Sequence, residues 1–401
     1  MKILFVTWDG PQVFYLESLF LPIFRGLAPH GWEFHVLQFT WGDRQRVEQT
    51  RQACAEAGVP YRVVRVWRRP VSLGSLFTAI KGARDIRRTV QQWDIDVLMP
   101  RSTLPVLSSM RALQRNALPM VFDADGLPLD ERVDFGGMSS TGVAYRLLRD
   151  VEAQGVRRAD VVLTRTSKAK DILLARAGAG TSRDRFYKVG NGRDADRFVP
   201  MDQSVRTKVR ERLGIEAEAP LLVYAGSLGG KYQLSEMLEL FSAVHLRCPD
   251  ARLLIMTGSP ELAARGIRDF PGLRSSVVTL TVDAGQVYEY LASADLGLAL
   301  IKPSFSMQAA TAIKVGEYLL CGLPVIATDG VGDTSSITPK VGFMLTESNK
   351  DVFGEAATWF TDEVLPERER FRVRCREVGV EHHSLKSSVD SYSRALESLR
   401  P

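Results

Sequence analysis

The chain has 401 residues, 45% of them hydrophobic and 25% charged, which is typical of a globular protein with two domains. Its four cysteines are scattered and form no CxxC pair, which argues against a metal cage or a disulfide framework and fits a reducing cytosol. No run of about 18 apolar residues occurs, and the N-terminal MKILFVTW is too short for a signal peptide. We therefore expect a cytoplasmic protein with no membrane-spanning segment.

Positive charge is concentrated in the first half of the chain. The net charge is +5, and residues 1–198 hold 30 Lys and Arg against 21 Asp and Glu, whereas the remainder is mildly acidic. A basic half suggests an anionic partner such as lipid headgroups or a phosphorylated acceptor. Nucleic acid is not expected as a partner, because no recognised binding motif accompanies the charge.

The first half alternates strands with helices. A strand at residues 2–7 precedes a helix at 15–27, which Pro22 should kink, and a second strand at 33–39. Further helices are expected at 44–57, 75–92, 144–158 and 168–177, the last capped by Ser167, and further strands at 61–67, 95–100, 120–123 and 161–164. This order predicts a doubly wound parallel sheet. A GxGxxG fingerprint is absent, so the loop after the first strand is not a dinucleotide site.

The helix expected at residues 75–92 carries several cations along one face, among them Lys81, Arg84 and Arg88. One interpretation is a surface helix with a solvated basic face. The other, strengthened by Arg65 and Trp67 before it, is docking to an anionic membrane at its cytoplasmic face.

A loop dense in carboxylates follows the strand at residues 120–123. It contains Asp123, Asp125 and Glu131, and binding sites in doubly wound folds gather at the carboxyl ends of strands. We take these three residues as catalytic candidates. The alternative is a turn whose aspartates cap the next helix.

Residues 186–200 look like a domain boundary, because a strand ends in Asn-Gly and a polar run continues to a proline. A second series of strands and helices follows. Its first strand, at 221–225, leads into the glycine-rich loop Gly226-Ser227-Leu228-Gly229-Gly230-Lys231. Glycines let a phosphate approach the backbone and Lys231 supplies a cation, although glycines also serve tight turns. Val282, at the end of a strand expected at 277–282, is a further binding candidate.

The stretch from 302 to 328 joins a polar loop, a short helix and a buried strand. Thr311, Ala312 and Ile313 are expected to form the first helical turn, and Ser306 offers a hydroxyl just before it. Unpaired amides and the helix dipole at such a start favour an anion. Glu317 lies one turn further and can accept two ribose hydroxyls as bidentate hydrogen bonds. The pattern suits a nucleotide diphosphate-sugar.

Four stretches resemble the retaining GT-B glycosyltransferases of family 4, in the order and spacing of that family. They are VGNGRDADRFVP at 189–200, VYAGSLGGKYQLSEML at 223–238, ADLGLAL at 294–300 and KVGEYLLCGLPVIAT at 314–328. In the first half, DERVDFG and the helix containing Glu152 are similar to bacterial members that build surface polysaccharides.

The resemblance implies a GT-B fold: two Rossmann-like domains facing an interdomain cleft. It places an acceptor-binding domain at residues 1–198, a donor domain at 199–378 and a C-terminal helix at 379–401 that packs back on the first domain. Glu317 matches the second glutamate of the family pair and would bind the donor ribose. The first glutamate falls at Ala309, which leaves the sugar contact open. Lys231, and more weakly Lys314, match the cations that hold the diphosphate.

The implied function is retaining transfer of a sugar, from a UDP- or GDP-sugar, to a glycan or lipid-linked acceptor in bacterial polysaccharide or glycoconjugate synthesis. We expect no metal and no cofactor besides the donor itself, since Asp123-Ala-Asp125 has DxD spacing but lies in the acceptor half. The alternatives are a sugar-nucleotide epimerase of the same fold and a non-catalytic scaffold or sugar-binding partner.

Overall fold

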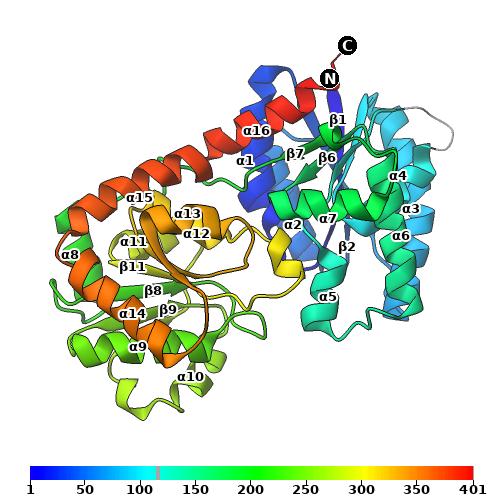
Figure 1. Ribbon diagram of the computed structural model, residues 1–401. Helices are drawn as coiled ribbons and strands as arrows, with labels where there is room; N and C mark the ends of the chain where they lie inside the picture. The colour runs from blue at the N-terminus through cyan, green and yellow to red at the C-terminus, as the bar shows by residue number, and fades with distance from the viewer. Residues whose placement is uncertain (114–117, 401) are drawn as a thin grey trace. The chain divides into compact units, whose positions relative to one another are not determined.

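The computed structural model of the protein describes residues 1–113 and 118–400, and it divides into two compact units (Figure 1). The first unit comprises Met1–Gly190 and Ser388–Pro401, and the second comprises Asn191–Ser387. The sequence places the corresponding divisions after residue 198 and after residue 378.

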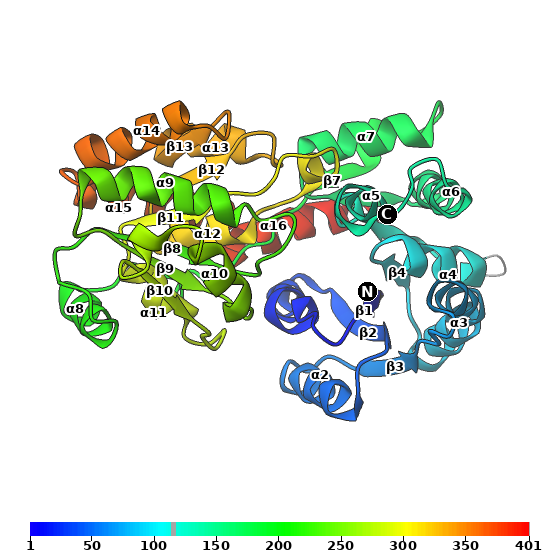
Figure 2. The same ribbon diagram turned by 90° about the horizontal axis from the view of Figure 1, so that it is seen from below.

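Within its described residues, the first unit contains seven parallel strands. In the order β3-β2-β1-β4 (Figure 2) they are Tyr61–Arg65, Glu33–Thr40, Lys2–Asp9 and Val97–Pro100, and in the order β5-β6-β7 they are Val121–Asp123, Val161–Thr164 and Phe186–Lys188. Single parallel bridges from Leu98 to Met120 and from Arg101 to Asp123 join the two groups of strands. The predicted doubly wound parallel sheet is therefore confirmed, and its strand order reverses between β1 and β4.

Helices and short helical turns connect these strands. They are η1 (Leu16–Phe20), α1 (Leu21–Leu27), η2 (Ala28–His30), α2 (Arg44–Glu56), α3 (Val71–Trp93), α4 (Thr103–Leu113), α5 (Pro128–Gly136), α6 (Val143–Arg158), α7 (Ser167–Ala177) and η3 (Arg183–Arg185). Pro22 lies in the first turn of α1, after a π-helical turn, where its missing N–H costs nothing. The helix α7 is capped by Thr166, whose side chain accepts from the amide of Ala169, so the expectation that Ser167 is the cap was wrong.

The second unit is built on one parallel sheet of six strands. In the order β10-β9-β8-β11-β12-β13 they are Val277–Leu280, Arg252–Met256, Leu221–Ala225, Leu296–Ala299, Val325–Thr328 and Gly342–Leu345, and Figure 1 shows β11, β8 and β9 side by side. Three of the six strands, β8, β11 and β12, are buried along their whole length, and β9 is buried except at Arg252, as expected for a sheet covered on both faces.

The helices of the second unit cover both faces of this sheet. They are α8 (Gln203–Arg212), α9 (Leu234–Arg247), α10 (Pro260–Ile267), η4 (Pro271–Leu273), α11 (Val287–Ala292), η5 (Ser306–Ala309), α12 (Ile313–Leu320), α13 (Thr334–Val341), α14 (Lys350–Trp359), η6 (Phe360–Val364) and α15 (Arg368–His383). Leu296 and Leu298 join the core beneath α9 and α14, whereas a Cβ on Gly297 would meet the Tyr318 ring of α12 at 2.3 Å. Alternate residues of β11 thus face opposite helical layers. The last helix, α16 (Leu385–Glu397), contains the second division between the units.

Candidate functional site

The candidate donor loops follow β8 and β11, the two neighbouring strands at which the strand order of the second unit reverses. In doubly wound sheets, ligands bind outside the carboxyl ends of the strands at this position. The loop after β8 runs from Gly226 to Lys231, and the segment after β11 leads through η5 into α12. An antiparallel bridge between Tyr232 and Ile301 and a hydrogen bond of 2.8 Å from the amide of Lys302 to the carbonyl of Lys231 hold the two together.

The glycine-rich loop has a backbone that side chains would disfavour. Gly226 has φ +144° and Gly229 has φ +150°, values in the region where glycine is favoured. A Cβ on Gly226 would lie 3.1 Å from the Nζ atom of Lys314, so this glycine makes room for the lysine. The Tyr224 hydroxyl donates to the carbonyl of Ser227 at 2.5 Å, which fixes the start of the loop, and no Cβ contact would arise at Gly230.

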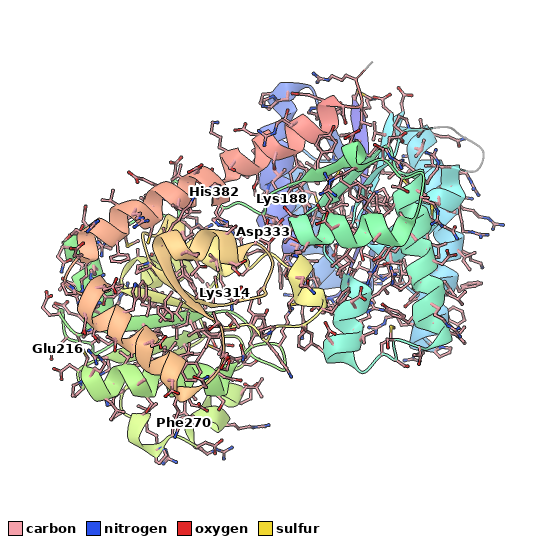
Figure 3. All side chains as sticks on the ribbon, viewed as in Figure 1. Lys188, Glu216, Phe270, Lys314, Asp333 and His382 are labelled. Carbon is pink, nitrogen blue, oxygen red and sulfur yellow. The ribbon has the colours of Figure 1, made fainter. Side chains whose placement is uncertain are left out.

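Lys314 points back from α12 to this loop and is labelled in Figure 3. Its Nζ lies 3.9 Å from the Tyr224 ring centroid and 4.5 Å from that of Tyr232. The Nζ is shielded from solvent and, within the described part of the chain, has no hydrogen-bond partner. Burial lowers its pKa to about 7, Glu317 opposes this shift, and Lys231 adds to it. A buried, unneutralised ammonium beside glycine amides favours an anion.

Glu317 forms an ion pair with Arg193, the arginine of the NGRDADRF stretch. The Nε atom of Arg193 lies 2.8 Å from Oε1 of Glu317, and both side chains are largely buried. Backbone hydrogen bonds from the Arg193 amide to the His383 carbonyl and from the Leu385 amide to the Arg193 carbonyl hold this segment in place. The carboxylate is thus oriented by a residue that lies 124 positions away in the sequence.

The remaining donor candidates lie in the segments before α12 and after β10. Helix α12 begins at Ile313 with Ala312 as its N-cap, so Thr311 and Ala312 precede the helix rather than forming its first turn as expected. Ser306 is buried, 3.3 Å from the hydroxyl of Ser304, and Ala309 is fully buried at the end of η5. Strand β10 ends at Leu280, so Val282 lies in the following loop instead of a strand.

In the first unit, Asp123 and Asp125 belong to a buried cluster of opposite charges that also includes Asp9, Arg101 and Arg165. Arg165 Nη2 is 2.8 Å from Asp123 Oδ2, and Arg101 Nη2 is 2.5 Å from Asp125 Oδ2. Arg101 also lies 4.0 Å from oxygens of both Asp9 and Asp123. These residues end or follow β1, β4, β5 and β6, so the cluster occupies the carboxyl edge where the strand order of this unit reverses.

The two candidate aspartates differ in exposure. Asp123 is completely buried, whereas the side chain of Asp125 is 29% exposed and its φ of +52° is rare for a residue other than glycine. Burial raises the pKa of Asp125, against the effect of Arg101. Asp123 therefore has the environment of a structural anchor, and Asp125 that of a residue which can reach a ligand.

Glu131 lies in the first turn of α5 and is half-buried. Its neighbour Asp130 is more deeply enclosed: it accepts two hydrogen bonds of 2.8 Å from Arg176 and one of 2.7 Å from the Tyr145 hydroxyl. Arg176 also reaches Glu152 at 3.2 Å, and burial raises the pKa of Glu152. The acidic stretch 123–131 is thus divided between two separate ion-pair networks.

Sequence reasoning missed Asp9, Arg101, Arg165 and Arg193 as members of these sites. For Arg101 a signal exists, since it directly follows a predicted strand, and Asp123 stands at the end of the next one. Nothing in the linear pattern brings Arg193 to Glu317, because the contact depends on how α12 and the segment around residue 193 pack.

No group of three or more His, Cys, Asp or Glu side chains with metal-ligand geometry occurs among residues 1–113 and 118–400. Over the same residues, no helix combines the length and the hydropathy that a membrane span requires.

Both halves of the chain match glycosyltransferase domains. Residues 19–192 match the family described as "Glycosyl transferase 4-like domain", and residues 219–362 match "Glycosyl transferases group 1". The chain is 24% identical over 327 residues to a GDP-mannose-dependent alpha-(1-6)-phosphatidylinositol dimannoside mannosyltransferase of Mycobacterium tuberculosis, covering 75% of this chain and 81% of that protein. It is also 28% identical over 212 residues to a D-inositol 3-phosphate glycosyltransferase of Xylanimonas cellulosilytica, spanning 49% of this chain and only 47% of that protein.

The fold also matches a solved structure along its whole length. The Anabaena protein HepE, crystallised with UDP and glucose, superimposes with a TM-score of 0.74 at 16% identity, over 99% of this chain and 100% of that one. The likeness confirms the predicted GT-B fold of two Rossmann-like domains with parallel sheets.

Proposed function

We propose that this protein, with its two glycosyltransferase domains, transfers a sugar with retention of configuration from a nucleotide diphosphate-sugar to a glycan or lipid-linked acceptor in bacterial polysaccharide or glycoconjugate synthesis. The observation that carries the proposal is the enclosed, unneutralised Nζ of Lys314 beside the glycine-rich loop. A site with a buried cation, free backbone amides and a nearby carboxylate matches a ligand with a diphosphate and a ribose.

The second unit would bind the donor. Lys314, Lys231 and the amides of residues 227–230 would contact the diphosphate, together with the amides at Thr311 to Ile313 and the Ser306 hydroxyl, whereas the Gly226 amide donates to the Met256 carbonyl at 2.9 Å. Glu317, held by Arg193, would accept the ribose hydroxyls. Val282 would line the nucleoside side of the site. The M. tuberculosis relative is GDP-mannose-dependent by its name and HepE was crystallised with UDP-glucose, which supports a UDP- or GDP-sugar.

The proposed transfer depends more on neutralising the charge of the leaving diphosphate than on a nucleophilic side chain of the protein. As the glycosidic C–O bond to the β-phosphate breaks, negative charge grows on the phosphate oxygens, and the Lys314 ammonium and the loop amides stabilise it. The acceptor oxygen attacks the face that the diphosphate leaves, and a phosphate oxygen takes the acceptor proton. No metal ion and no further cofactor take part in this proposal.

The first unit would bind the acceptor at its own carboxyl edge. Asp125, partly exposed and paired to Arg101, would orient the acceptor hydroxyl, with Glu131 as a second candidate and Asp123 as the anchor of the cluster. Large apolar side chains stand exposed on and before α3: Trp67, Leu73, Phe77 and Ile80. Together with Lys81 and Arg68 they would dock the unit on the anionic inner face of a membrane.

The epimerase alternative is not favoured, since both domain matches and the curated relatives are glycosyltransferases. The non-catalytic alternative rests on Ala309, which stands where the family has its first glutamate.

A thermal-shift screen against UDP-, GDP-, ADP- and dTDP-sugars tests the donor, because a bound donor stabilises the protein by mass action. The donor found is then incubated with a lipid or glycan acceptor pool, with and without EDTA, and the anomeric configuration of the product is read by NMR. We expect an α-linked product from an α-linked donor. Release of an epimerised nucleotide-sugar without acceptor, or donor binding without turnover, would support the alternatives instead.

A further inference from the structure

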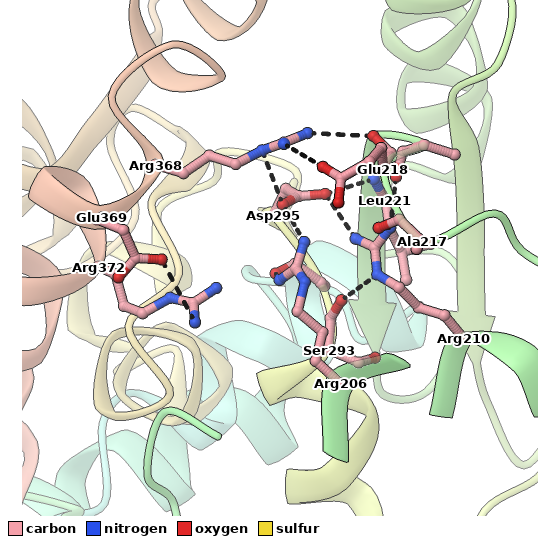
Figure 4. Close-up of polar contacts among 12 residues, drawn as sticks. Arg206, Arg210, Ala217, Glu218, Leu221, Ser293, Asp295, Arg368, Glu369 and Arg372 are labelled. Atoms are coloured by element: carbon pink, nitrogen blue, oxygen red, sulfur yellow. Dashed lines mark hydrogen bonds and ion pairs between the residues drawn. The ribbon is translucent and has the colours of Figure 1, made fainter. Parts of the chain in front are cut away.

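A group of arginines surrounds one buried carboxylate at the amino edge of the second unit's sheet (Figure 4). Asp295 directly precedes β11, and its oxygens accept from Arg206 at 2.5 Å and from Arg210 at 2.8 Å. The amide of Leu221, the first residue of β8, donates to the same carboxylate at 2.8 Å. Burial alone would raise the pKa of Asp295, but these arginines and Arg368 lower it. This inner part of the cluster ties α8 to the sheet and needs no ligand.

The two outer arginines of this cluster, Arg368 and Arg372, are less well neutralised by carboxylates than Arg206 and Arg210. Arg368 lies 3.3 Å from Asp295, but its other carboxylate neighbour, Glu218, is 3.6 Å away and 82% exposed. Arg372 approaches a carboxylate only at Glu369, 3.8 Å away and 80% exposed, among the residues the structure describes. Burial lowers the pKa of Arg372, and the nearby charges of Arg206 and Arg368 lower it further. The region around Arg368 and Arg372 therefore carries an excess of positive charge.

These two side chains line an open cavity of about 540 Å³. Glu218, Glu367 and Glu369 lie on its border, and the Arg372 stem passes Gly322 so closely that a Cβ there would lie 2.6 Å from its Cγ. A volume of this size accommodates a small metabolite. Guanidinium groups form paired hydrogen bonds with phosphate oxygens. The glutamates at the border of the cavity are solvated and do not satisfy Arg368 and Arg372 in this way.

We propose that this cavity binds a small phosphate-bearing molecule, with Arg368 and Arg372 as its principal contacts. It is separate from the proposed donor site, because Leu221 and Asp295 stand at the amino ends of β8 and β11, whereas the donor loops follow the carboxyl ends of the same strands. Nothing in the proposed glycosyl transfer uses these arginines.

Titration by ³¹P NMR at constant ionic strength tests the site, with inorganic phosphate and glycerol 3-phosphate as probes and sodium chloride as the ionic control. We expect Arg372→Gln to weaken binding at least tenfold. Arg374→Gln, an exposed position two residues along the same helix, should leave it unchanged, and so should Lys314→Met in the proposed donor site. Arg368→Gln is the second variant, should Arg372→Gln fold poorly.

Tighter binding of glycerol 3-phosphate than of phosphate, lost in the arginine variants, would assign an organic phosphate. The reverse order with the same loss would assign the free ion. Binding that survives both arginine substitutions, that disappears in Lys314→Met alone, or that chloride reproduces would overturn the proposal. The Lys314→Met outcome concerns the donor site alone, so the two proposals fail independently.

Discussion

Arg193 Nε and Glu317 Oε1 lie 2.8 Å apart within the second unit, and this pair joins the segment after β7 to helix α12. Their side chains are 20% and 13% exposed. The contact gives Glu317 a fixed orientation before any ligand arrives, and each carboxylate oxygen keeps a free lone pair for a hydroxyl donor.

Replacing Glu317 by alanine should weaken the affinity for the nucleotide-sugar about 10- to 150-fold, since hydrogen bonds to a charged group contribute about 1.5–3 kcal/mol. Calorimetric titration of the donor measures the change. Glu355→Ala, an exposed helical glutamate of the same unit, is the matched control and should bind normally. Unchanged donor affinity in Glu317→Ala would rule out the ribose contact.

Arg193→Gln should raise the donor KM several-fold while kcat stays near its wild-type value, because the arginine positions Glu317 and takes no part in the reaction. In a double-mutant cycle its effect should vanish on the Glu317→Ala background. Full additivity of the two substitutions would show that Arg193 acts by another route.

Lys314→Met should abolish measurable donor binding and yet leave the unliganded protein as stable or more stable at neutral pH. The substitution removes a buried charge that lies in no ion pair or hydrogen bond within the described residues, and it keeps the apolar contacts with Tyr224 and Tyr232. Urea unfolding and donor titration of the same samples separate the two effects. Lys350→Met, at an exposed helix start, serves as control. A destabilised variant with normal donor affinity would show that the lysine is structural.

We expect the protein to take up a proton when it binds the donor above neutral pH. Burial holds the pKa of Lys314 at about 7, well below its ordinary value, so the free site is largely neutral at pH 8.5, whereas a diphosphate favours the ammonium. Calorimetry of UDP binding in two buffers of different ionisation enthalpy measures this uptake, which should be absent in Lys314→Met.

The lowered pKa of Lys314 also makes the free energy of unfolding depend on pH. The unfolded chain holds the proton up to the ordinary lysine pKa and the folded chain releases it from about pH 7, so the cost of the buried charge is complete below pH 7. That cost falls as the pH rises toward 10. The stability difference between wild type and Lys314→Met should narrow over this window.

Asp123→Asn should destabilise the protein by about 3–5 kcal/mol, because it leaves Arg165 buried without its carboxylate. Asp125→Asn should cost less stability, since that side chain is partly exposed, but should lower kcat if Asp125 orients the acceptor. Denaturant unfolding and steady-state kinetics on both variants distinguish anchor from catalytic residue. Equal stability losses in the two would contradict the assignment.

Trp67→Ser combined with Phe77→Ser should reduce co-sedimentation with vesicles containing phosphatidylglycerol. Trp67 is 54% exposed and its ring packs edge-on against that of Phe77, with centroids 5.5 Å apart. Leu246→Ser, a highly exposed leucine of the second unit, is the control. Binding that is equal on phosphatidylcholine vesicles with and without phosphatidylglycerol would exclude electrostatic docking.

The regular elements of the fold were predictable where apolar periodicity is strong. The apolar residues up to Ala225 and the glycines after it indicated a strand and a glycine-rich loop, and both are present. Phosphate binding by this loop stays a prediction. Helix α4 was missed, because its mixture of buried serines and leucines lacks a polar face. The end of β10 and the start of α12 were each misplaced by two residues, since such ends depend on hydrogen bonds that the sequence does not reveal.

The site residues were harder to predict than the elements that carry them. Lys314 was only the weaker of two lysines that the family resemblance matched to the diphosphate, and the sequence does not show which way its side chain points. Its orientation depends on the missing side chain of Gly226 and on two aromatic rings that come from different elements. The charge cluster of the first unit is equally non-local, because Asp123 meets Arg165 through neighbouring strands 42 residues apart.

The chain passes between its two compact units twice, after Gly190 and again within α16. Residues 388–400 complete the first unit: Tyr392 is fully buried there, and Val389 fills the space left by the absent side chain of Gly26. Residues 1–190 expressed alone would therefore expose the apolar surface that residues 388–400 cover, and we expect them to aggregate. Adding the α16 residues as a separate peptide should restore solubility. Any attempt to exchange the first unit between related chains has to carry both segments, because the recipient's own last helix would otherwise pack against a foreign apolar surface.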